Sequence, residues 1–255
     1  MKKILLAIAV VLVFLPYEIA AKEIVIATGE WPPYSSAKMS NGGLCTELVQ
    51  AAFEAVNIRV KFKFFPWKRA WLNVERGKVD TSFPWRKNDF REKYALFSKE
   101  LYEEHSIVLY DKQFVTDEDF QNRDALVEQH GLAFVAGDAW ISVFKQKNVK
   151  ITIVPDLVSA IRMLERGRVR FLHINTEVAL YGVDKYGQGT GTDFGTFSLF
   201  DDAMDNHVVF PKKIAESEEL RDRFEKGLGL IKESGKYSEI LSRYKFLKVS
   251  QQFIE

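Results

Sequence analysis

Cysteine is almost absent from this chain of 255 residues, because Cys45 is the only one. A single thiol forms no internal disulfide and no cysteine-based metal site, so we expect Cys45 to be a small buried apolar side chain. Histidine is scarce as well. The four histidines, His105, His130, His173 and His207, are far apart and lack the spacing of a metal site. The sequence therefore predicts no bound metal and no other cofactor.

An excess of charge of either sign is also missing. The 36 basic and 35 acidic residues give a net charge of +1. Without residues 1–21, which include Lys2, Lys3 and Glu18, 34 basic residues stand against 34 acidic ones. Nucleic acids and anionic membranes are bound through a basic face. Neither is therefore expected as the main partner.

Long hydrophobic runs are limited to one, Ile4 to Leu15, which follows the positive Met1-Lys2-Lys3 and precedes the small residues Ala20-Ala21. Its twelve residues are fewer than the roughly 20 that a membrane-spanning helix needs. A signal peptide cleaved after Ala21 is favoured over a membrane anchor, and no cysteine near the cut is present to accept lipid. We expect a periplasmic monomer with no membrane insertion of the mature chain.

The first third of the chain contains tryptophan next to proline in three segments. The three segments are Trp31-Pro32-Pro33-Tyr34, Pro66-Trp67 and Pro84-Trp85-Arg86. A proline ends a strand or opens a helix, so each segment is predicted to be a turn whose aromatic ring is free to line a cleft. Together they predict a concave aromatic site with arginine at its edge.

Apolar spacing predicts two successive units in which strands alternate with helices. The expected strands are 23–28, 60–64, 79–83, 131–136, 151–154 and 169–174, and the expected helices are 43–56, 68–75, 139–147 and 157–165. Such alternation is typical of mostly parallel sheets with right-handed crossovers. Ligands of these sheets bind beyond the carboxyl ends of the strands, where the three tryptophan segments lie. The repetition predicts two lobes with a cleft between them.

An ordered set of residues resembles the family 3 extracellular solute-binding proteins, which include the amino-acid receptors of ABC importers. The set is Ile26-x-Thr28, Pro33-Tyr34, Gly43-Leu44-x-x-Glu47-Leu48, Trp67, Gly77-x-x-Asp80, Arg91 and Phe97-Ser98-x-x-Leu101-Tyr102. The segments 220–231, 233–237 and 240–244 are similar to that family's last two helices. The resemblance implies the α/β, two-lobed type II periplasmic binding protein fold. Residues 22–109 and 209–255 would form lobe 1 and residues 110–208 lobe 2, with crossings near Val108–Tyr110 and Val208–Phe210.

The resemblance also implies ligand-binding residues in lobe 1. Arg91 falls where amino-acid binders carry an arginine that grips the ligand carboxylate with both prongs of its guanidinium; the alternative is a surface arginine. Arg86 would be a second positive anchor or part of a salt bridge between lobes. Trp67 would stack on the ligand or pack in a core. Of Glu30, Trp31 and Tyr34 on the first loop, one or two would reach the cleft.

Lobe 2 departs from the amino-acid pattern. Where amino-acid binders tend to have Gly-Ser/Thr, this chain has Gly137-Asp138-Ala139-Trp140, and where they usually have an aspartate that holds the ligand ammonium it has Asn175. A neutral amide supplies no charge attraction for an ammonium. Asp138 or Glu30 would have to replace the aspartate, or the ligand is another small anion, a peptide-like molecule or an aromatic compound.

Three classes of function are therefore open. The first is a binding protein that captures a small carboxylate-bearing molecule, an amino acid or a related organic acid, for an ABC permease or a membrane sensor. The second is an enzyme on the same scaffold, like the cyclohexadienyl dehydratases, with Glu30, Asp138 or His173 as proton donor. Here His173 is expected to face the cleft from a strand end. The third is a ligand-free, partner-binding protein. Residues 187–192 are glycine-rich but follow a helix, so they are predicted to form a loop and not a phosphate site.

Overall fold

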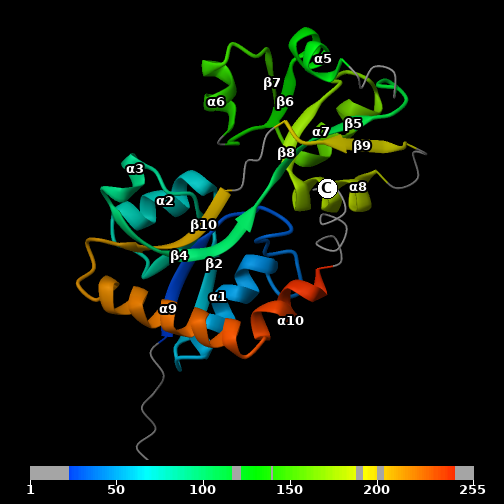
Figure 1. Cartoon of the computed structure of the whole chain (residues 1–255). Coiled ribbons are helices and arrows are strands. Elements are labelled where there is room, and N and C mark those ends of the chain that lie inside the picture. Colours follow the sequence, from blue (N-terminus) through cyan, green and yellow to red (C-terminus); the bar gives the residue numbers. More distant parts are fainter. Residues whose placement is uncertain (1–22, 117–121, 139, 188–191, 200–203, 245–255) are drawn as a thin grey trace, which may run out of the picture.

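A computed structural model describes residues 23–116, 122–138, 140–187, 192–199 and 204–244 (Figure 1). The predicted signal peptide, Ala139 and most of the glycine-rich loop lie outside these ranges. The strands are β1 (Glu23–Thr28), β2 (Arg59–Phe64), β3 (Thr81–Trp85), β4 (Ala95–Glu104), β5 (Ser106–Asp111), β6 (Leu132–Val135), β7 (Ile151–Val154), β8 (Leu172–Asn175), β9 (Phe194–Phe197) and β10 (Met204–Pro211). The helices are α1 (Leu44–Glu54), α2 (Trp67–Glu75), α3 (Asp89–Glu92), α5 (Arg123–His130), α6 (Trp140–Gln146), α7 (Leu157–Glu165), α8 (Thr176–Tyr186), α9 (Ser217–Glu233) and α10 (Lys236–Arg243).

The strands form two five-stranded sheets, in the orders β2-β1-β3-β10-β4 and β7-β6-β8-β5-β9. In each sheet the first three strands pair in parallel, and the next strand, β10 or β5, is antiparallel to both of its neighbours. Figure 1 shows each sheet with its own helices, as two lobes. The predicted two-lobed α/β fold is confirmed.

Alternation along β1 explains how lobe 1 is layered. Ile24 and Ile26 are fully buried in the cluster formed with α1 and α9, whereas Ala27 packs in a second cluster with α2 on the other face. Successive residues of a strand point to opposite faces of the sheet, so one apolar strand is covered by helices on both sides. Cys45, on α1, is buried as expected, with 1% of its surface exposed.

Close contact between α1 and α9 depends on Gly227. A Cβ atom at this position would lie 1.9 Å from the carbonyl oxygen of Ala52 on α1. The two helix backbones approach too closely there for any side chain. In contrast, a Cβ at Gly229, two residues further along α9, would meet nothing within 4 Å.

The end of the third strand was wrongly predicted. The strand runs to Trp85 and contains Pro84, although a proline has no N–H for the ladder. Its pairing is through Thr81 and Ser82 with β1 and through Ser82 and Trp85 with β10, so no pairing depends on the missing N–H. Trp85 is therefore not at a turn, and only 6% of its surface is exposed.

The chain passes from the first sheet to the second at His105, between β4 and β5, and returns between β9 and β10. The expected crossing residues lie further along, inside strands: Val108–Tyr110 is paired within β5 and Val208–Phe210 is part of β10. These residues are as buried as ordinary strand residues. In the described ranges, no helix has the length and apolar character needed to cross a membrane.

Candidate ligand-binding site

Three predicted residues lie at the carboxyl ends of β1, β2 and β3. Glu30 follows β1, Trp67 begins α2 just after β2, and Arg86 follows β3. The indole N–H of Trp67 donates to the backbone oxygen of Glu30 over 3.2 Å. The ring of Trp67 also meets Trp31 and Trp85 edge to face, with centroids 6.4 and 5.2 Å apart. Because Trp31 and Trp67 are both half-buried, this group presents aromatic surface at the edge of the sheet.

Arg91 lies on the same aromatic group. It belongs to the single turn α3, where its backbone N–H donates to the Oδ1 of Asn88 over 2.8 Å. Its guanidinium is 4.8 Å from the ring centre of Trp85 and 5.5 Å from that of Trp71, and its Nη1 donates to the backbone oxygen of Arg86 over 2.7 Å. Burial lowers the pKa of Arg91, and the charge of Arg86 lowers it further. Arg91 is thus a half-buried cation fixed by ring stacking.

Arg86 forms an ion pair with Glu104. Glu104 is the last residue of β4 in the same sheet, so the alternative of a salt bridge between lobes is wrong. Only 1% of Glu104 is exposed. Burial raises the pKa of Glu104, while the positive charge of Arg86 opposes that rise. The positive guanidinium of Arg86 and the carboxylate of Glu104 therefore lie close to His105, where the chain crosses between the lobes.

Tyr34 connects the lobes. It is fully buried, and its hydroxyl donates to Oε2 of Glu177, on α8 of lobe 2, over 2.5 Å. The hydroxyl of Tyr102 donates to the other oxygen, Oε1, over 3.1 Å. Burial, and next the charge of Glu177, raise the pKa of both tyrosines, so both hydroxyls stay protonated and donate. In this conformation Tyr34 packs between the lobes and has no surface for a ligand.

The lobe 2 candidates have different surroundings. The Oδ1 of Asp138 accepts the backbone N–H of Trp140 over 2.7 Å and so supports the start of α6. Asn175 ends β8 opposite Ser106 of β5 and is 7% exposed. The expectation that His173 faces the cleft is wrong, because the residue is only 2% exposed and its ring lies among the aromatic rings of Phe134, Trp140 and Phe144.

Two residues of this region, Glu104 and Glu177, were not predicted from the sequence. Glu104 ends β4, for which no strand was expected, and Glu177 lies in the first turn of α8, and an acidic residue is usually solvated. Their burial follows from long-range contacts, since 143 positions separate Tyr34 from Glu177. The one sequence signal that could have pointed to Glu177 is its position along the chain, shortly after the predicted site residue Asn175.

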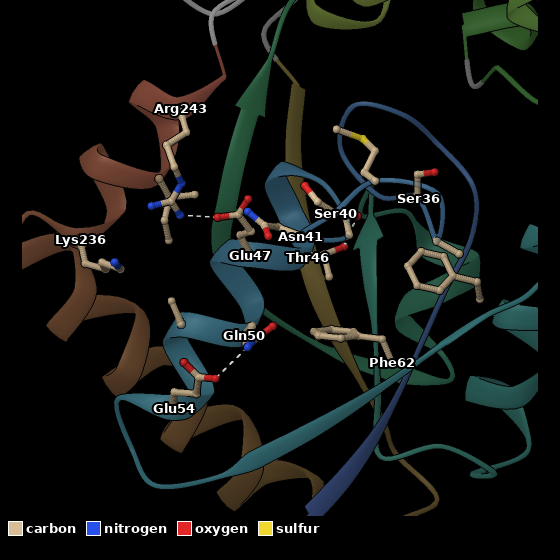
Figure 2. A pocket seen from close by; sticks show the side chains of 16 residues that line it. Ser36, Ser40, Asn41, Thr46, Glu47, Gln50, Glu54, Phe62, Lys236 and Arg243 are labelled. Carbon is tan, nitrogen blue, oxygen red and sulfur yellow. Dashed lines mark hydrogen bonds and ion pairs between the residues drawn. The ribbon is translucent and has the colours of Figure 1, made fainter.

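A separate groove of about 770 Å³ lies on lobe 1 between α1, α10, β2 and the loop of residues 36–42 (Figure 2). Figure 2 shows Arg243 of α10 paired with Glu47 of α1 at one end of it. The hydroxyl of Tyr244 donates to the same carboxylate over 2.6 Å. None of the eight predicted ligand-binding residues lines this groove. The groove lies where α1 and α10 meet, and it is distinct from the strand-end site.

This architecture matches that of a known protein family. Residues 24–248 match the model of the bacterial extracellular solute-binding proteins, family 3. The chain belongs to this family. A comparison with curated proteins finds no match for this solute-binding protein.

Solved structures share the fold of this solute-binding protein at low identity. A histidine kinase sensor domain with similarity to periplasmic binding proteins has a TM-score of 0.71 and 17% identity, covering 88% of this chain and 96% of its own. The GluR0 ligand-binding core from Nostoc punctiforme, in complex with L-glutamate, has 0.67 and 15%, covering 87% and 98%. The ancestral amino acid-binding protein AncCDT-1, a precursor of cyclohexadienyl dehydratase, has 0.66 and 17%, covering 87% and 94%.

Gly29→Ala is expected to displace the indole of Trp67. A Cβ at Gly29 would lie 2.5 Å from two ring carbons of Trp67, well inside ordinary contact distance. Because Trp67 is predicted to stack on the ligand, its displacement is expected to weaken ligand binding by about 0.5–1.5 kcal/mol. Tryptophan fluorescence and calorimetric titration measure the two effects, with Gly229→Ala as the control. Unchanged fluorescence and affinity in Gly29→Ala would contradict the placement of Trp67.

Proposed function

We propose that this protein captures a small carboxylate-bearing molecule, an amino acid or a related organic acid, between its lobes. The observation that carries the proposal is Arg91, a half-buried guanidinium stacked on Trp85 at the edge of the strand-end site. A planar guanidinium binds a carboxylate with two parallel hydrogen bonds. Stacking holds the plane of the fork in place, which reduces the entropy lost on binding.

The aromatic group beside Arg91 supports a ligand with an organic body. Trp31 and Trp67 expose part of their rings next to the arginine, and such rings bind apolar or planar groups. Glu30 accepts the backbone N–H of Ala37 over 2.9 Å and is exposed, so it shapes the first loop and lies at the rim. We propose that Trp31, Trp67, Arg86, Arg91 and Asn175 contact the ligand.

Capture by a binding protein is favoured over catalysis by the positions of the three named proton donors. The carboxylates of Glu30 and Asp138 each accept a backbone N–H, and His173 is packed in the aromatic core of lobe 2. A general acid must reach the reacting atom, which His173 does not do from this core. The neighbour AncCDT-1 is described as a precursor of a dehydratase, and assay of prephenate-like acids for turnover tests the enzyme alternative.

The proposed output is delivery of the ligand to a membrane protein in the periplasm, after cleavage at Ala21. The family is named extracellular, and the structural neighbours include a sensor domain of a histidine kinase. An ABC permease and a membrane sensor are the two candidate partners. A ligand that contacts both lobes favours the arrangement in which both contacts are made, and we propose that either partner recognises that arrangement.

A thermal-shift screen tests the proposal. At a hundredfold excess of ligand over its Kd, the folded state gains about 2.7 kcal/mol, which raises Tm by roughly 5–10 °C for a chain of this size. The screen pairs L-amino acids and organic acids with their carboxamide counterparts, which have the same body and no negative charge. Acids are expected to raise Tm and carboxamides to do so much less. Equal shifts for both members of each pair would overturn the proposal.

A further inference from the structure

Basic residues gather in one stretch of lobe 1, although the net charge of the chain is close to zero. Residues 59–80 contain seven basic residues and only two acidic ones. The basic residues are Arg59, Lys61, Lys63, Lys68, Arg69, Arg76 and Lys78. All seven are exposed. This stretch therefore carries a local excess of positive charge that the composition of the whole chain conceals.

The fold places these cations on one side of the lobe 1 sheet. β2 is the edge strand, and its Lys61 lies beside Val25 of β1, which packs in the cluster with α2. Alternate residues of a strand point to the same face, so Arg59 and Lys63 point to the α2 side as Lys61 does. Figure 1 shows α2 on the opposite side of this sheet from α9. The three cations thus form a row at roughly 7 Å intervals.

Helix α2 adds further cations to the same side. Its inner residues Ala70, Trp71 and Val74 pack on the sheet, whereas its exposed residues include Lys68 and Arg69. Arg76 and Lys78 directly follow the end of α2. We call the seven basic residues of the stretch 59–80 the basic face.

The carboxylates of the same stretch do not neutralise the basic face. Oε1 of Glu75 accepts the indole N–H of Trp71, and Oδ2 of Asp80 accepts the backbone N–H of Val25 over 2.7 Å. Among the residues that the structure describes, no ion pair includes the six cations from Lys61 to Lys78. Their charges are therefore directed to solvent or to a partner.

An exposed aromatic ring borders the basic face. Phe90 of α3 is 53% exposed, and its ring centre lies 6.3 Å from that of Trp71 on α2. Lys87 and Lys93, on either side of it in the chain, are exposed as well. Basic residues alone suit any anionic partner. Phenylalanine next to them favours a lipid surface, because such rings enter the boundary between headgroups and acyl chains while lysine ammoniums remain among the phosphates.

We propose that the basic face binds the anionic headgroups of a phospholipid surface. The near-neutral net charge predicted no anionic membrane as the main partner, but net charge is not what such a surface senses. Because screening limits the reach of exposed charges to about 8 Å at physiological salt, the surface meets mainly the face nearest to it. Clusters of four to eight basic residues are enough for this kind of binding. The binding is peripheral, without insertion of a helix, and it holds the protein beside a membrane.

Co-sedimentation with vesicles tests the proposal. The protein without residues 1–21 is used, because the apolar run 4–15 would itself bind lipid. One set of vesicles is phosphatidylcholine, and the other contains equal parts of phosphatidylcholine and phosphatidylglycerol. We expect binding to the anionic vesicles only. Binding should be lost in 1 M salt, where the screening length is about 3 Å.

A triple variant locates the binding surface. Lys61→Gln, Lys63→Gln and Lys68→Gln together should weaken binding to the anionic vesicles by roughly 100-fold, since each basic residue near an anionic leaflet contributes separately to the attraction. All three side chains are exposed, so the fold should be retained, and circular dichroism checks this.

The matched control carries Lys145→Gln, Lys150→Gln and Lys226→Gln, which change the net charge by the same amount. These lysines are exposed, two of them on lobe 2 and the third on α9. The control should bind anionic vesicles as the wild type does. Equal loss of binding in both triple variants would overturn the assignment to the basic face, and so would full binding by the first variant.

Two outcomes with the wild type alone would also overturn the proposal. Equal binding to both kinds of vesicle would show that charge is not the cause. Binding to neither would leave the lysines of β2 with the role of discouraging pairing of this edge strand with another sheet. Poly-L-glutamate is tested in parallel: if it binds and the vesicles do not, the partner is an acidic protein and the lipid proposal fails. None of these outcomes depends on the proposed ligand.

Discussion

Arg91→Ala is expected to weaken binding of the carboxylate ligand by about 2–5 kcal/mol, by analogy with truncation of buried interfacial charge pairs. The change leaves the ligand carboxylate desolvated and without its paired donors. Arg91→Lys should restore only part of the affinity, because lysine keeps the charge and loses the fork. Calorimetric titration with an acid found in the thermal-shift screen measures both variants.

The matched control is Arg69→Ala, which removes an exposed arginine on the neighbouring helix α2. It should bind as the wild type does, which separates a specific contact from a general loss of positive charge. If Arg91→Ala binds normally and Arg86→Ala does not, the anchor is Arg86. If neither substitution matters, the ligand is not an anion.

Gly227→Ala is expected to destabilise lobe 1 by about 3 kcal/mol or more, at the upper end of overpacking effects. The new methyl carbon would lie 1.9 Å from the carbonyl oxygen of Ala52, and a backbone atom within a helix moves only if α1 and α9 separate. The higher helix propensity of alanine, worth about 1 kcal/mol, offsets a small part. Chemical denaturation followed by circular dichroism measures the change.

Gly229→Ala makes the same chemical change on the same helix, where a Cβ meets nothing within 4 Å. It should be neutral or stabilising by up to about 1 kcal/mol through helix propensity. Similar midpoints for the two alanine variants would show that the approach of α1 to α9 is looser than described.

The elements predicted best from the sequence are those with local signals. The bounds expected for β1, β7 and α7 agree with the structure, because an apolar run or a helical repeat ends at a residue that stops it. In α7 the side chain of Asp156 accepts the N–H of Ser159 over 2.7 Å, a helix start that is visible in the sequence. The two-lobed arrangement followed from the repetition of such units and from the resemblance.

The errors concern residues whose surroundings come from distant parts of the chain. Pro84 was expected to end a strand, but whether a proline is tolerated depends on which neighbours of β3 pair with which residues. Trp85 is buried by contacts with Trp67 and Trp71, in a cluster that includes Val209 of β10, which no local pattern reveals. Glu104 was overlooked because its ion pair with Arg86 joins two residues that are 18 positions apart in the chain.

The two bonds from Tyr34 and Tyr102 to Glu177 have a consequence for motion. They span the lobes next to the crossing at His105, so any rotation that preserves them turns about an axis close to Glu177. Displacement in a rotation grows with distance from its axis. Glu104 and Asn175, near the crossing, therefore keep almost constant separation while the far rims of the lobes swing apart. The parts of the two lobes beside Glu177 would therefore keep nearly the same relative geometry whether the lobes are open or closed, and the change on closure would be concentrated at their outer rims.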